Sequence, residues 1–399
     1  MDGSGHPLKV LFYQFFPAGG IGRYTNELAS ALHSTSEIDV EVACSRDFAY
    51  RENAPYRVYP QLASLTHQNA ILRKLKFMLA QGLSPAALLR RARQEGVDIV
   101  HFSNINHLTY RFWREQVRRQ AYRVAVTVHD VRRKKAILNR AWEERGLRCF
   151  YQDADALFVH SQVQLEDLLE FASPDPSRVH IVPHGPYAYP ETNISKAQIR
   201  ANFRIPEART VGLCFGMVRD DKNVSEQLSA LAKMTEDRPF LVVAGKMPSS
   251  GPGSEEALRQ RIVSLGLEAD VLLLNRYIGD DEVGQLYRAA DFACLTYKSY
   301  FTSQSGVLNV AMHFDCPVLA TPAPTLAETV GNYRIGCVCP GDQAGDIVKG
   351  LKALLGKLDQ GEAFDFAAYR KAHSWQENAR QTLAVYRRMI RHEKATERR

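Results

Sequence analysis

The stretch Thr302-Ser-Gln-Ser-Gly-Val-Leu-Asn-Val-Ala-Met312 lies between two apolar runs, Phe292-Ala-Cys-Leu-Thr-Tyr297 and Pro317-Val-Leu-Ala-Thr321. Short apolar runs on either side of a small-residue loop and a helix-compatible segment predict a strand, a loop, a helix and a second strand. A loop of Ser, Gln and Gly at a helix start offers unpaired backbone N–H groups and the positive end of a helix dipole. The stretch therefore predicts a phosphate-binding loop within an α/β unit.

The same alternation continues toward both ends of the chain. Apolar strands that alternate with helices predict parallel sheets covered on both faces. In the first half, we expect strands at residues 8–16, 39–44, 98–102, 124–129, 154–161 and 178–185, and helices at 23–32, 69–79 and 85–94. In the second half, we expect strands at 211–218, 240–245, 271–276, 292–297 and 317–321, and helices at 224–235, 254–266, 281–290, 305–314 and 343–358.

A chain of 399 residues is too long for one ordinary core and predicts two domains. The periodicity lapses where Pro, Asn and Ser gather, which is typical of a linker. We therefore expect an N-terminal domain at 1–190, a linker at 191–208 and a C-terminal domain at 209–372. Ser374-Trp-Gln-Glu377 is a capping box that opens a final helix over 373–399.

The composition, 45% hydrophobic and 24% charged, is typical of a globular protein. No apolar run approaches the roughly 18 residues that cross a membrane, and no signal peptide is expected. A cytoplasmic location follows as the expectation. The seven cysteines are expected to be reduced core residues, because their number is odd and most lie in or beside apolar runs.

The net charge of +7 is unevenly distributed. Residues 51–150 carry 20 Lys and Arg against 7 Asp and Glu, so the remainder of the chain is net acidic. This basic surplus suits an anionic substrate, a membrane surface, nucleic acid or simply a solvated face. Nucleic acid is disfavoured, because Tyr110, Phe112 and Trp113 are too few stacking aromatics.

The helix expected at 69–79 carries Ile71, Leu72, Leu75 and Met78 on one side, with basic residues interleaved. This pattern is typical of a surface helix packed on a sheet, or of a helix that contacts lipid. Peripheral attachment to the inner face of a membrane is therefore an open alternative.

Ligands of parallel sheets bind at the carboxyl ends of the strands. Two predicted strands end in His129-Asp130 and His184-Gly185, so both histidines are candidate site residues. Asp153-Ala-Asp155 has the look of a metal motif, but it precedes a strand. We therefore expect no metal there.

Two further loops have the chemistry of phosphate binding. Pro17-Ala-Gly-Gly-Ile-Gly22 joins a strand to a helix and lets a ligand approach the backbone, although it is not a dinucleotide fingerprint. Phe215-Gly-Met-Val-Arg-Asp-Asp-Lys222 places Arg219 and Lys222 between a strand and a helix, where two cations would neutralise a diphosphate.

In this order and spacing, seven motifs resemble the retaining nucleotide-sugar glycosyltransferases of family 4, which have the GT-B fold of two facing Rossmann-like domains. The motifs are Gly19-Gly-Ile-Gly-Arg-Tyr24, Thr127-Val-His-Asp130, Val182-Pro-His-Gly185, Phe215-Gly-Met-Val-Arg-Asp-Asp-Lys222, Val243-Ala-Gly245, Thr302-Ser-Gln-Ser-Gly306 and Pro317-Val-Leu-Ala320.

The resemblance implies a metal-independent, retaining hexosyltransferase without a cofactor. The donor would be a UDP-, GDP- or other nucleotide diphosphate sugar, and the acceptor a hydroxyl of a glycan, a lipid-linked or a small molecule. The final helix would cross back to the first domain. The implied catalytic residues are His129, which would face the transferred sugar, Arg219 and Lys222. The implied donor-binding residues are Gly20, Gly22, Gly216, Gly245, Tyr277, Ile278, Ser303, Gln304, Ser305, Gly306 and Val307, and those on the acceptor side are Arg23, Tyr24, Asp130 and His184.

One feature departs from the family. Two glutamates usually stand eight positions apart around the opening stretch, and these positions are Thr302 and Val310 here. A catalytically idle GT-B protein that binds a nucleotide sugar or a glycan is therefore the main alternative. An isomerase or phosphorylase of the same architecture is a further one.

Overall fold

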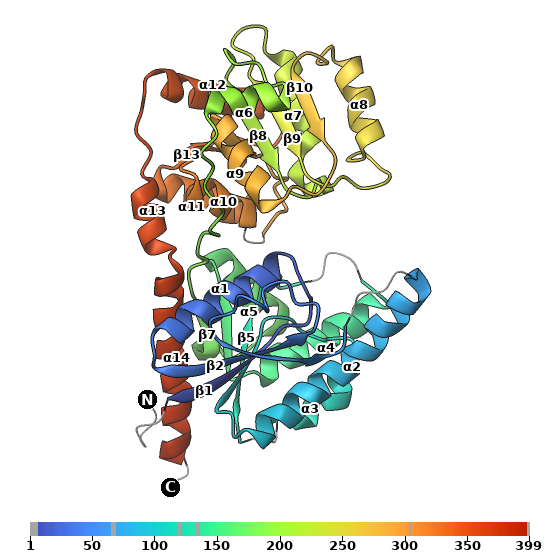
Figure 1. Ribbon diagram of the computed structural model, residues 1–399, viewed down its shortest axis with the longest axis vertical. Helices are drawn as coiled ribbons and strands as arrows, with labels where there is room; N and C mark the ends of the chain where they lie inside the picture. Colours follow the sequence, from blue (N-terminus) through green and yellow to red (C-terminus); the bar gives the residue numbers. More distant parts are fainter. Residues whose placement is uncertain (1–6, 65–68, 119–120, 133–135, 303–304, 397–399) are drawn as a thin grey trace. The chain divides into compact units, whose positions relative to one another are not determined.

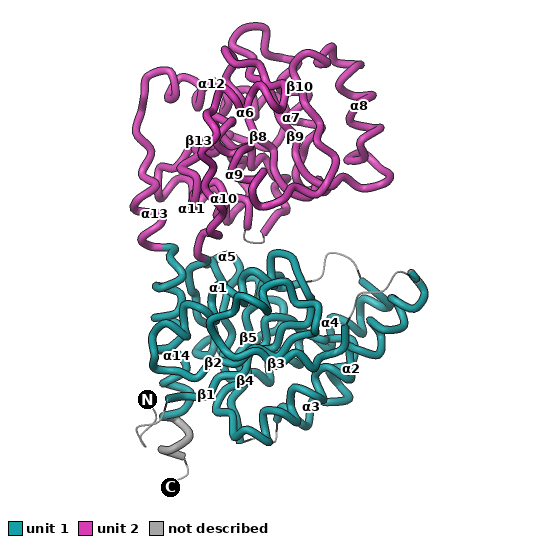
Figure 2. The backbone as a smooth tube through the Cα atoms, in the orientation of Figure 1, with its two compact units in different colours: residues 1–184, 373–399 teal, residues 185–372 magenta. Residues whose placement is uncertain are grey.

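The computed structural model describes residues 7–64, 69–118, 121–132, 136–302 and 305–396. The chain forms two compact units, drawn in teal and magenta in Figure 2. Unit 1 holds the residues up to His184 together with those from His373 onward, and unit 2 is Gly185–Ala372. The end of the chain thus belongs to the same unit as its beginning.

Unit 1 is built on a parallel sheet in the order β3-β2-β1-β4-β5-β6-β7, with helices on both faces (Figure 1). The edge strand β3 was not expected, because it carries Pro60 and few buried side chains, which is typical of an edge. The strands are β1 (Leu8–Tyr13), β2 (Ile38–Ser45), β3 (Arg57–Leu62), β4 (Ile99–Phe102), β5 (Arg123–Thr127), β6 (Ala156–Val159) and β7 (Val179–Ile181).

The helices of unit 1 differ from expectation mainly at Pro85. The two helices predicted at 69–79 and 85–94 form one continuous helix, α2, with Pro85 inside it. Ala80 and Leu88 on either side of Pro85 are buried in the same core, and packing of this kind outweighs one lost backbone hydrogen bond. The helices are α1 (Gly20–Ser34), α2 (Ala70–Gln94), α3 (Tyr110–Arg118), α4 (Arg140–Asp153), α5 (Gln162–Ala172) and α14 (Trp375–Thr396).

The last helix, α14, completes unit 1 by packing on α1. The Ser374 hydroxyl accepts a hydrogen bond from the Glu377 N–H at 3.1 Å, as the capping box predicts. Farther along, the Tyr386 hydroxyl lies 2.5 Å from His101 Nδ1, in the middle of the sheet. The fold class, with two Rossmann-like α/β units and a final helix on the first, is confirmed.

Unit 2 is built on a second parallel sheet, in the order β10-β9-β8-β11-β12-β13. Its strands are β8 (Val211–Phe215), β9 (Phe240–Ala244), β10 (Val271–Leu274), β11 (Phe292–Leu295), β12 (Val318–Ala320) and β13 (Gly336–Val338). Its helices are α6 (Lys196–Phe203), α7 (Val224–Lys233), α8 (Glu255–Ser264), α9 (Asp280–Ala289), α10 (Gly306–His313), α11 (Pro324–Tyr333), α12 (Ala344–Asp359) and α13 (Phe366–Ala372). All seven cysteines of the chain are free.

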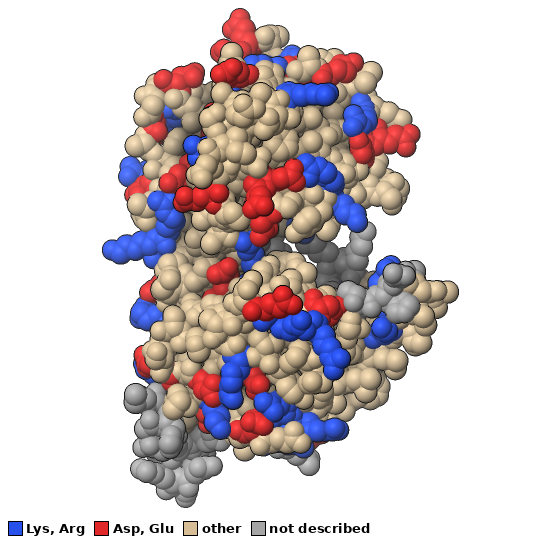
Figure 3. Space-filling model, in the orientation of Figure 1, with Lys and Arg blue, Asp and Glu red and all other residues tan. Residues whose placement is uncertain are grey.

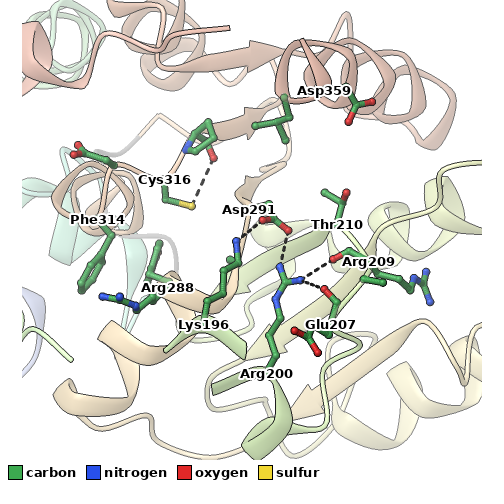
Figure 4. Close-up of a pocket in the computed structure, with 16 residues that line it drawn as sticks. Lys196, Arg200, Glu207, Arg209, Thr210, Arg288, Asp291, Phe314, Cys316 and Asp359 are labelled. Carbon is green, nitrogen blue, oxygen red and sulfur yellow. Dashed lines mark hydrogen bonds and ion pairs between the residues drawn. The ribbon is translucent and has the colours of Figure 1, made fainter. Parts of the chain in front are cut away.

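Residues 191–208, which the sequence presents as a linker, contain α6 and are anchored in unit 2. The buried Arg200 guanidinium donates to the carbonyl oxygens of Ala289 and Glu207 and to the Asp291 carboxylate. Figure 4 shows Lys196 and Arg200 both pointing toward Asp291 in a hollow of about 610 Å³. Lys196 and Arg200 both pair with Asp291, so the charged groups of this hollow serve to anchor α6 on unit 2.

Candidate active site

Two glycines close the carboxyl edge of the unit 2 sheet. Gly216 follows β8 with a φ of +90°, and Gly245 follows β9 with a φ of +143°. A Cβ atom at Gly245 would overlap the carbonyl oxygen of Gly216. The close contact between the two strand ends therefore explains why glycine stands at position 245. The predicted role of Gly245 in donor binding stays a prediction.

Replacing Gly245 by Ala is expected to lower the free energy of unfolding by about 2–4 kcal/mol, because φ strain and steric overlap add. Urea unfolding followed by far-UV circular dichroism measures this loss. Gly253→Ala is the matched control, since the atoms nearest to its added Cβ lie at 3.6 Å. Equal stability of the two variants would show that the contact at Gly245 is loose.

The Lys222 side chain packs against Gly216 and is 5% exposed. Its ammonium donates to the carbonyl oxygen of Phe215 and lies 5.4 Å from the centre of the Tyr297 ring. A Cβ atom at Gly216 would lie 3.5 Å from Lys222 Nζ and 3.4 Å from Val307 Cγ2. The structure thus brings together Gly216, Lys222 and Val307, three of the predicted residues.

Arg219 lies in a different environment from Lys222. Its side chain is half exposed and pairs with the Asp221 carboxylate at 3.1 Å. It lines a hollow of about 350 Å³ together with Lys298, whose ammonium pairs with Asp220 at 2.8 Å. The sequence analysis gives Lys222 and Arg219 the same role, but their environments differ. Lys222 is buried against Gly216, whereas the charge of Arg219 is paired with the Asp221 carboxylate.

The start of α10 lies at the same edge of the sheet. Ser305 caps this helix, because its hydroxyl accepts a hydrogen bond from the Leu308 N–H at 3.3 Å. The Tyr297 hydroxyl lies 3.2 Å from Ser305 Oγ, so Tyr297 contacts both the helix cap and Lys222. Gly306 is the first residue of α10, whereas Ser303 and Gln304 lie outside the described residues.

Two of the predicted donor-binding residues, Tyr277 and Ile278, follow β10, where the resemblance places the base of the nucleotide. Tyr277 is 81% exposed, and Ile278 is buried. Arg276 forms a two-pronged ion pair with Glu282 at 2.6 and 2.5 Å, which holds this loop on α9. The exposed Tyr277 ring is available for stacking, but its role as a base contact stays a prediction.

In unit 1, the glycine loop leads into α1. Gly19 precedes the helix with a φ of +91°, and a Cβ atom at Gly19 or Gly20 would meet no atom within 4 Å. Gly22 instead faces Gln14 and Phe48, at 3.5 and 3.6 Å from such an atom. Arg23 lies in the first turn of α1, and its backbone N–H donates a hydrogen bond to the Gly19 carbonyl oxygen. Open space above Gly19 and Gly20 suits the close approach of a ligand to the helix start.

Three histidine rings surround the buried Tyr24 ring of α1. The ring centres of His129, His160 and His184 lie 4.7, 5.2 and 5.1 Å from that of Tyr24. Asn378 of α14 donates to the Tyr24 hydroxyl at 3.1 Å and to the Pro183 carbonyl at 2.6 Å. The predicted residues His129, Tyr24 and His184 thus form one cluster, which His160 and α14 complete.

Burial disfavours the protonated form of His129, His160 and the nearby His101. It lowers the pKa of His160 to about 4 and that of His101 to about 3. The pKa of His129 is well below its usual value, chiefly through burial and also through the neighbouring histidines. His160 Nδ1 lies 3.0 Å from the Val182 carbonyl, which only accepts, so the proton is on Nδ1 and Nε2 carries a lone pair.

This neutrality predicts a pH dependence of stability. The unfolded chain binds a proton at each histidine below a pKa of about 6.5, but the native state resists protonation of His160 down to about pH 4. Native stability is therefore expected to fall as pH decreases from 6.5 to 4. For His160→Gln we expect a slope that is smaller by up to about 1.4 kcal/mol per pH unit.

Urea unfolding followed by tryptophan fluorescence measures this slope, because Trp113, Trp142 and Trp375 all lie in unit 1. The control is His33→Gln, at an exposed position on α1. A slope for His160→Gln equal to that of the wild type and the control would show that His160 is not held neutral.

Asp153 and Asp155 both make hydrogen bonds within unit 1. The Asp153 carboxylate accepts hydrogen bonds from Arg114 and from the Tyr110 hydroxyl, and that of Asp155 accepts from the Val124 N–H at 2.8 Å. Across the described ranges, no three His, Cys, Asp or Glu side chains are grouped so as to hold a metal ion.

Comparison with known families finds a match in each half of the chain. Residues 18–186 match the family described as Glycosyltransferase Family 4, and residues 195–382 match Glycosyl transferases group 1. The first half of the chain is thus similar to family 4 glycosyltransferases, and the second half is similar to group 1 glycosyltransferases.

The curated relatives are also named as glycosyltransferases. The D-inositol 3-phosphate glycosyltransferase of Mycobacteroides abscessus is 29% identical over 250 residues, which are 62% of this chain and 54% of that relative. The chain thus spans about half the length of the curated relatives it matches. Sucrose-phosphate synthase from Thermosynechococcus elongatus superposes with a TM-score of 0.72 at 17% identity, covering 96% of this chain and 99% of that one. The Anabaena protein HepE in complex with UDP and glucose gives 0.71 at 15% identity, covering 95% and 99%. At these identities, the structural likeness shows the fold alone.

Proposed function

We propose that this protein transfers a sugar from a nucleotide diphosphate sugar to a hydroxyl group of an acceptor, with retention of the anomeric configuration. The observation that carries the proposal is the buried Lys222 ammonium beneath Gly216, beside Tyr297, in the half that matches group 1 glycosyltransferases. The complex of HepE with UDP and glucose supports a donor of this kind.

The chemistry proposed for unit 2 is stabilisation of the leaving group. When the bond between the sugar C1 and the phosphate oxygen breaks, negative charge develops on the diphosphate. The Lys222 ammonium and the amino end of α10 are fixed donors that gain strength as this charge grows. Lys222 donates one hydrogen to Phe215, which leaves two for phosphate oxygens. In this proposal the site needs no metal.

The proposed role of His129 is to hold the transferred sugar. A neutral imidazole can exchange a hydrogen bond with a sugar hydroxyl without adding charge near the developing oxocarbenium ion. The acceptor hydroxyl then attacks C1 from the face that the nucleotide leaves, and its proton passes to a donor phosphate oxygen. One C–O bond forms and one breaks on the same face of C1, so the anomeric configuration is retained.

Proton NMR of the product tests this proposal directly. With a donor whose sugar is α-linked, the anomeric coupling constant of the product is expected to be that of an α-glycoside. An inverted product would contradict the retaining mechanism, although glycosyl transfer itself would stand.

A catalytically idle protein is the second candidate, and one observation favours it. Val310, where the family usually has a carboxylate, is buried on α10, and Thr302 offers only a hydroxyl. An idle protein would bind a nucleotide sugar in a calorimeter and release no nucleotide over hours. Nucleotide release that depends on an acceptor would exclude it.

We also propose that unit 1 contacts a membrane surface through the N-terminal half of α2, which includes Ile71 to Leu79. Ile71, Leu75 and Leu79 are each more than half exposed, and Lys74 and Lys76 lie among them. Figure 3 shows Lys and Arg atoms beside uncharged side chains at the outer end of α2. Apolar side chains interleaved with cations suit an anionic lipid surface. No described helix has the length and apolar character needed to cross a bilayer.

Sedimentation with vesicles tests this contact. Binding to phosphatidylglycerol vesicles is expected to exceed binding to phosphatidylcholine vesicles and to weaken as salt rises. Leu75→Ser should reduce binding severalfold. The matched control is Val263→Ser, which removes an equally exposed apolar side chain from unit 2. Equal binding by both variants, or no binding to anionic vesicles, would contradict the contact.

A further inference from the structure

A side chain connects the ends of β5 and β6 in unit 1, where His129 and His160 follow the two strands. The main-chain ladder extends to the Val128 N–H, which donates to the Phe158 carbonyl oxygen at 2.8 Å. Just past this bond, Gln164 Nε2 donates to the His129 carbonyl oxygen at 3.1 Å, and Gln164 Oε1 accepts from the His160 N–H at 2.9 Å. One side-chain amide therefore takes the place of a peptide group between the two strands.

The orientation of this amide is fixed by the groups that it contacts. A carbonyl oxygen only accepts a hydrogen bond and a main-chain N–H only donates one, so a Gln164 amide turned by half a rotation would lose both bonds. Gln164 is 2% exposed, so bulk water cannot replace either bond. The side chain therefore has one favourable arrangement, in which both ends of the amide are used.

Gln164 is held in turn by the start of α5. The Ser161 hydroxyl caps this helix by accepting a hydrogen bond from the Gln164 N–H at 3.2 Å. Leu168 and Phe171, farther along α5, are buried in the core of unit 1. Because both its cap and its apolar face anchor the helix, the amide reaches the two strand ends from a fixed position.

The His160 end of this bridge is bonded to the rest of the sheet. His160 Nδ1 lies 3.0 Å from the Val182 carbonyl oxygen, and the Val182 N–H donates to the Val159 carbonyl oxygen at 2.9 Å. His160 thus contacts Gln164 through its main chain and the segment after β7 through its ring. The bridge therefore transmits the position of two strands, β6 and β7, to the residue at its other end, His129.

The bridge determines where the His129 imidazole lies. The bond at Val128 holds the main chain before His129, and Gln164 holds the carbonyl group of His129 itself. With the main chain held on both sides, the Cα–Cβ bond of His129 has one direction, and the Tyr24 ring packs nearly perpendicular to the imidazole, with ring centres 4.7 Å apart. A catalytic group has to be held to within about 0.5 Å of its productive position.

We propose that Gln164 is a positioning residue for glycosyl transfer, which holds the main chain at His129 so that the imidazole is presented to the transferred sugar. The inference rests on the proposed function and on the proposed role of His129. A misplacement of about 1 Å can lower a rate by about 10²-fold, even when the changed residue is remote from the reacting atoms. Loss of the bridge is therefore expected to affect turnover more than donor affinity.

Gln164→Leu removes both hydrogen bonds and keeps the approximate volume of the side chain. We expect nucleotide release at saturating donor to be about tenfold slower, with a calorimetric donor dissociation constant within about twofold of the wild type. The matched control is Gln152→Leu, the same change elsewhere in unit 1. It removes a hydrogen bond of 2.9 Å from Gln152 Nε2 to the Ala172 carbonyl oxygen at the far end of α5, and should leave turnover unchanged.

Gln164→Glu separates positioning from packing. A protonated carboxyl group can accept from the His160 N–H and donate to the His129 carbonyl oxygen, as the amide does, whereas a carboxylate cannot donate. Burial raises the pKa of the introduced carboxyl group, so its protonated form increases as pH falls from about 8 to about 5.5. The turnover of Gln164→Glu relative to wild type is therefore expected to rise over this range, while the ratio for Gln164→Leu stays constant.

The ratio to wild type isolates the introduced group. The ionisable groups of the adjoining segments are present in both proteins and cancel, namely His129, Asp130 and Arg132 after β5, His160 after β6, and Glu166 and Asp167 on α5.

Histidine side-chain NMR gives a readout that needs no turnover. The His129 signal is assigned by its absence from His129→Gln. It is expected to shift in Gln164→Leu and to stay in place in Gln152→Leu.

Three results would overturn the inference: wild-type turnover in Gln164→Leu, a loss in that variant confined to donor affinity, or an unmoved His129 signal. If Gln164→Leu does not fold, the pH response of Gln164→Glu decides, and a constant ratio overturns the inference. If the wild type releases no nucleotide with any acceptor, the proposed function fails, and the His129 signal alone decides whether Gln164 positions that ring.

Discussion

Replacing Lys222 by Met is expected to lower the turnover number by about 10²–10³-fold, a loss of roughly 3–4 kcal/mol of transition-state stabilisation. Methionine keeps the length and the burial of the side chain but removes the ammonium that donates to Phe215 and faces Gly216. The effect falls on turnover more than on donor affinity, because charge on the diphosphate increases as the sugar leaves. A coupled assay of nucleotide release at saturating donor measures it.

Two controls sharpen this result. Lys233→Met removes an exposed ammonium from the end of α7 and is expected to leave turnover unchanged. Arg219→Ala is expected to cost less than Lys222→Met, since the Arg219 guanidinium is half exposed and already paired with Asp221. If Lys222→Met turns over at the wild-type rate, the leaving-group role is wrong. If Arg219→Ala is the more damaging change, the two cations have been assigned in the wrong order.

Replacing His129 by Ala is expected to lower the turnover number by about 10–100-fold while the dissociation constant of the donor changes by less than about twofold. His129 follows β5 at the carboxyl edge of unit 1, and its Nε2 has no partner within the described structure. A hydrogen bond to the transferred sugar that strengthens as the sugar distorts affects the rate more than binding.

Steady-state kinetics together with calorimetric titration of the donor separates the two quantities for His129. His33→Gln, on the exposed face of α1, is the matched control and should match the wild type in both. An unaltered rate for His129→Ala would refute its role. A loss confined to donor affinity would instead indicate a simple binding contact.

Much of the fold could be predicted because parallel strands are buried on both faces and read as short apolar runs. Strands such as β8 and β11 lie within the segments expected for them. Lys222, His129 and His184 were identified as candidates for the same reason, since each follows a strand and ligands gather at strand ends. Their roles stay predictions.

What could not be predicted depends on contacts between distant segments. Tyr297 joins the cap of α10 to Lys222, but nothing in its local sequence distinguishes it from an ordinary core residue. His160 joins Tyr24 to His129 and follows the end of β6, but the strand expected at 154–161 placed it inside the strand. Gln81 is similar, because it lies on an amphipathic helix and its unpaired amide oxygen appears only when the ends of β4 and β5 are placed beside it. The difference between the buried Lys222 and the half-exposed Arg219 could not be predicted either, because it depends on the ion pair between Arg219 and Asp221.

The most direct test of the central claim is a thermal-shift titration of the full chain with UDP, GDP and ADP. A ligand that binds only the native state raises the melting temperature. We predict that one of the three nucleotides raises the melting temperature of the wild type, and that Lys222→Met shows a smaller rise while Lys233→Met shows the same rise as the wild type. No rise with any of the three, or an equal rise in Lys222→Met, would contradict a nucleotide diphosphate site at Lys222.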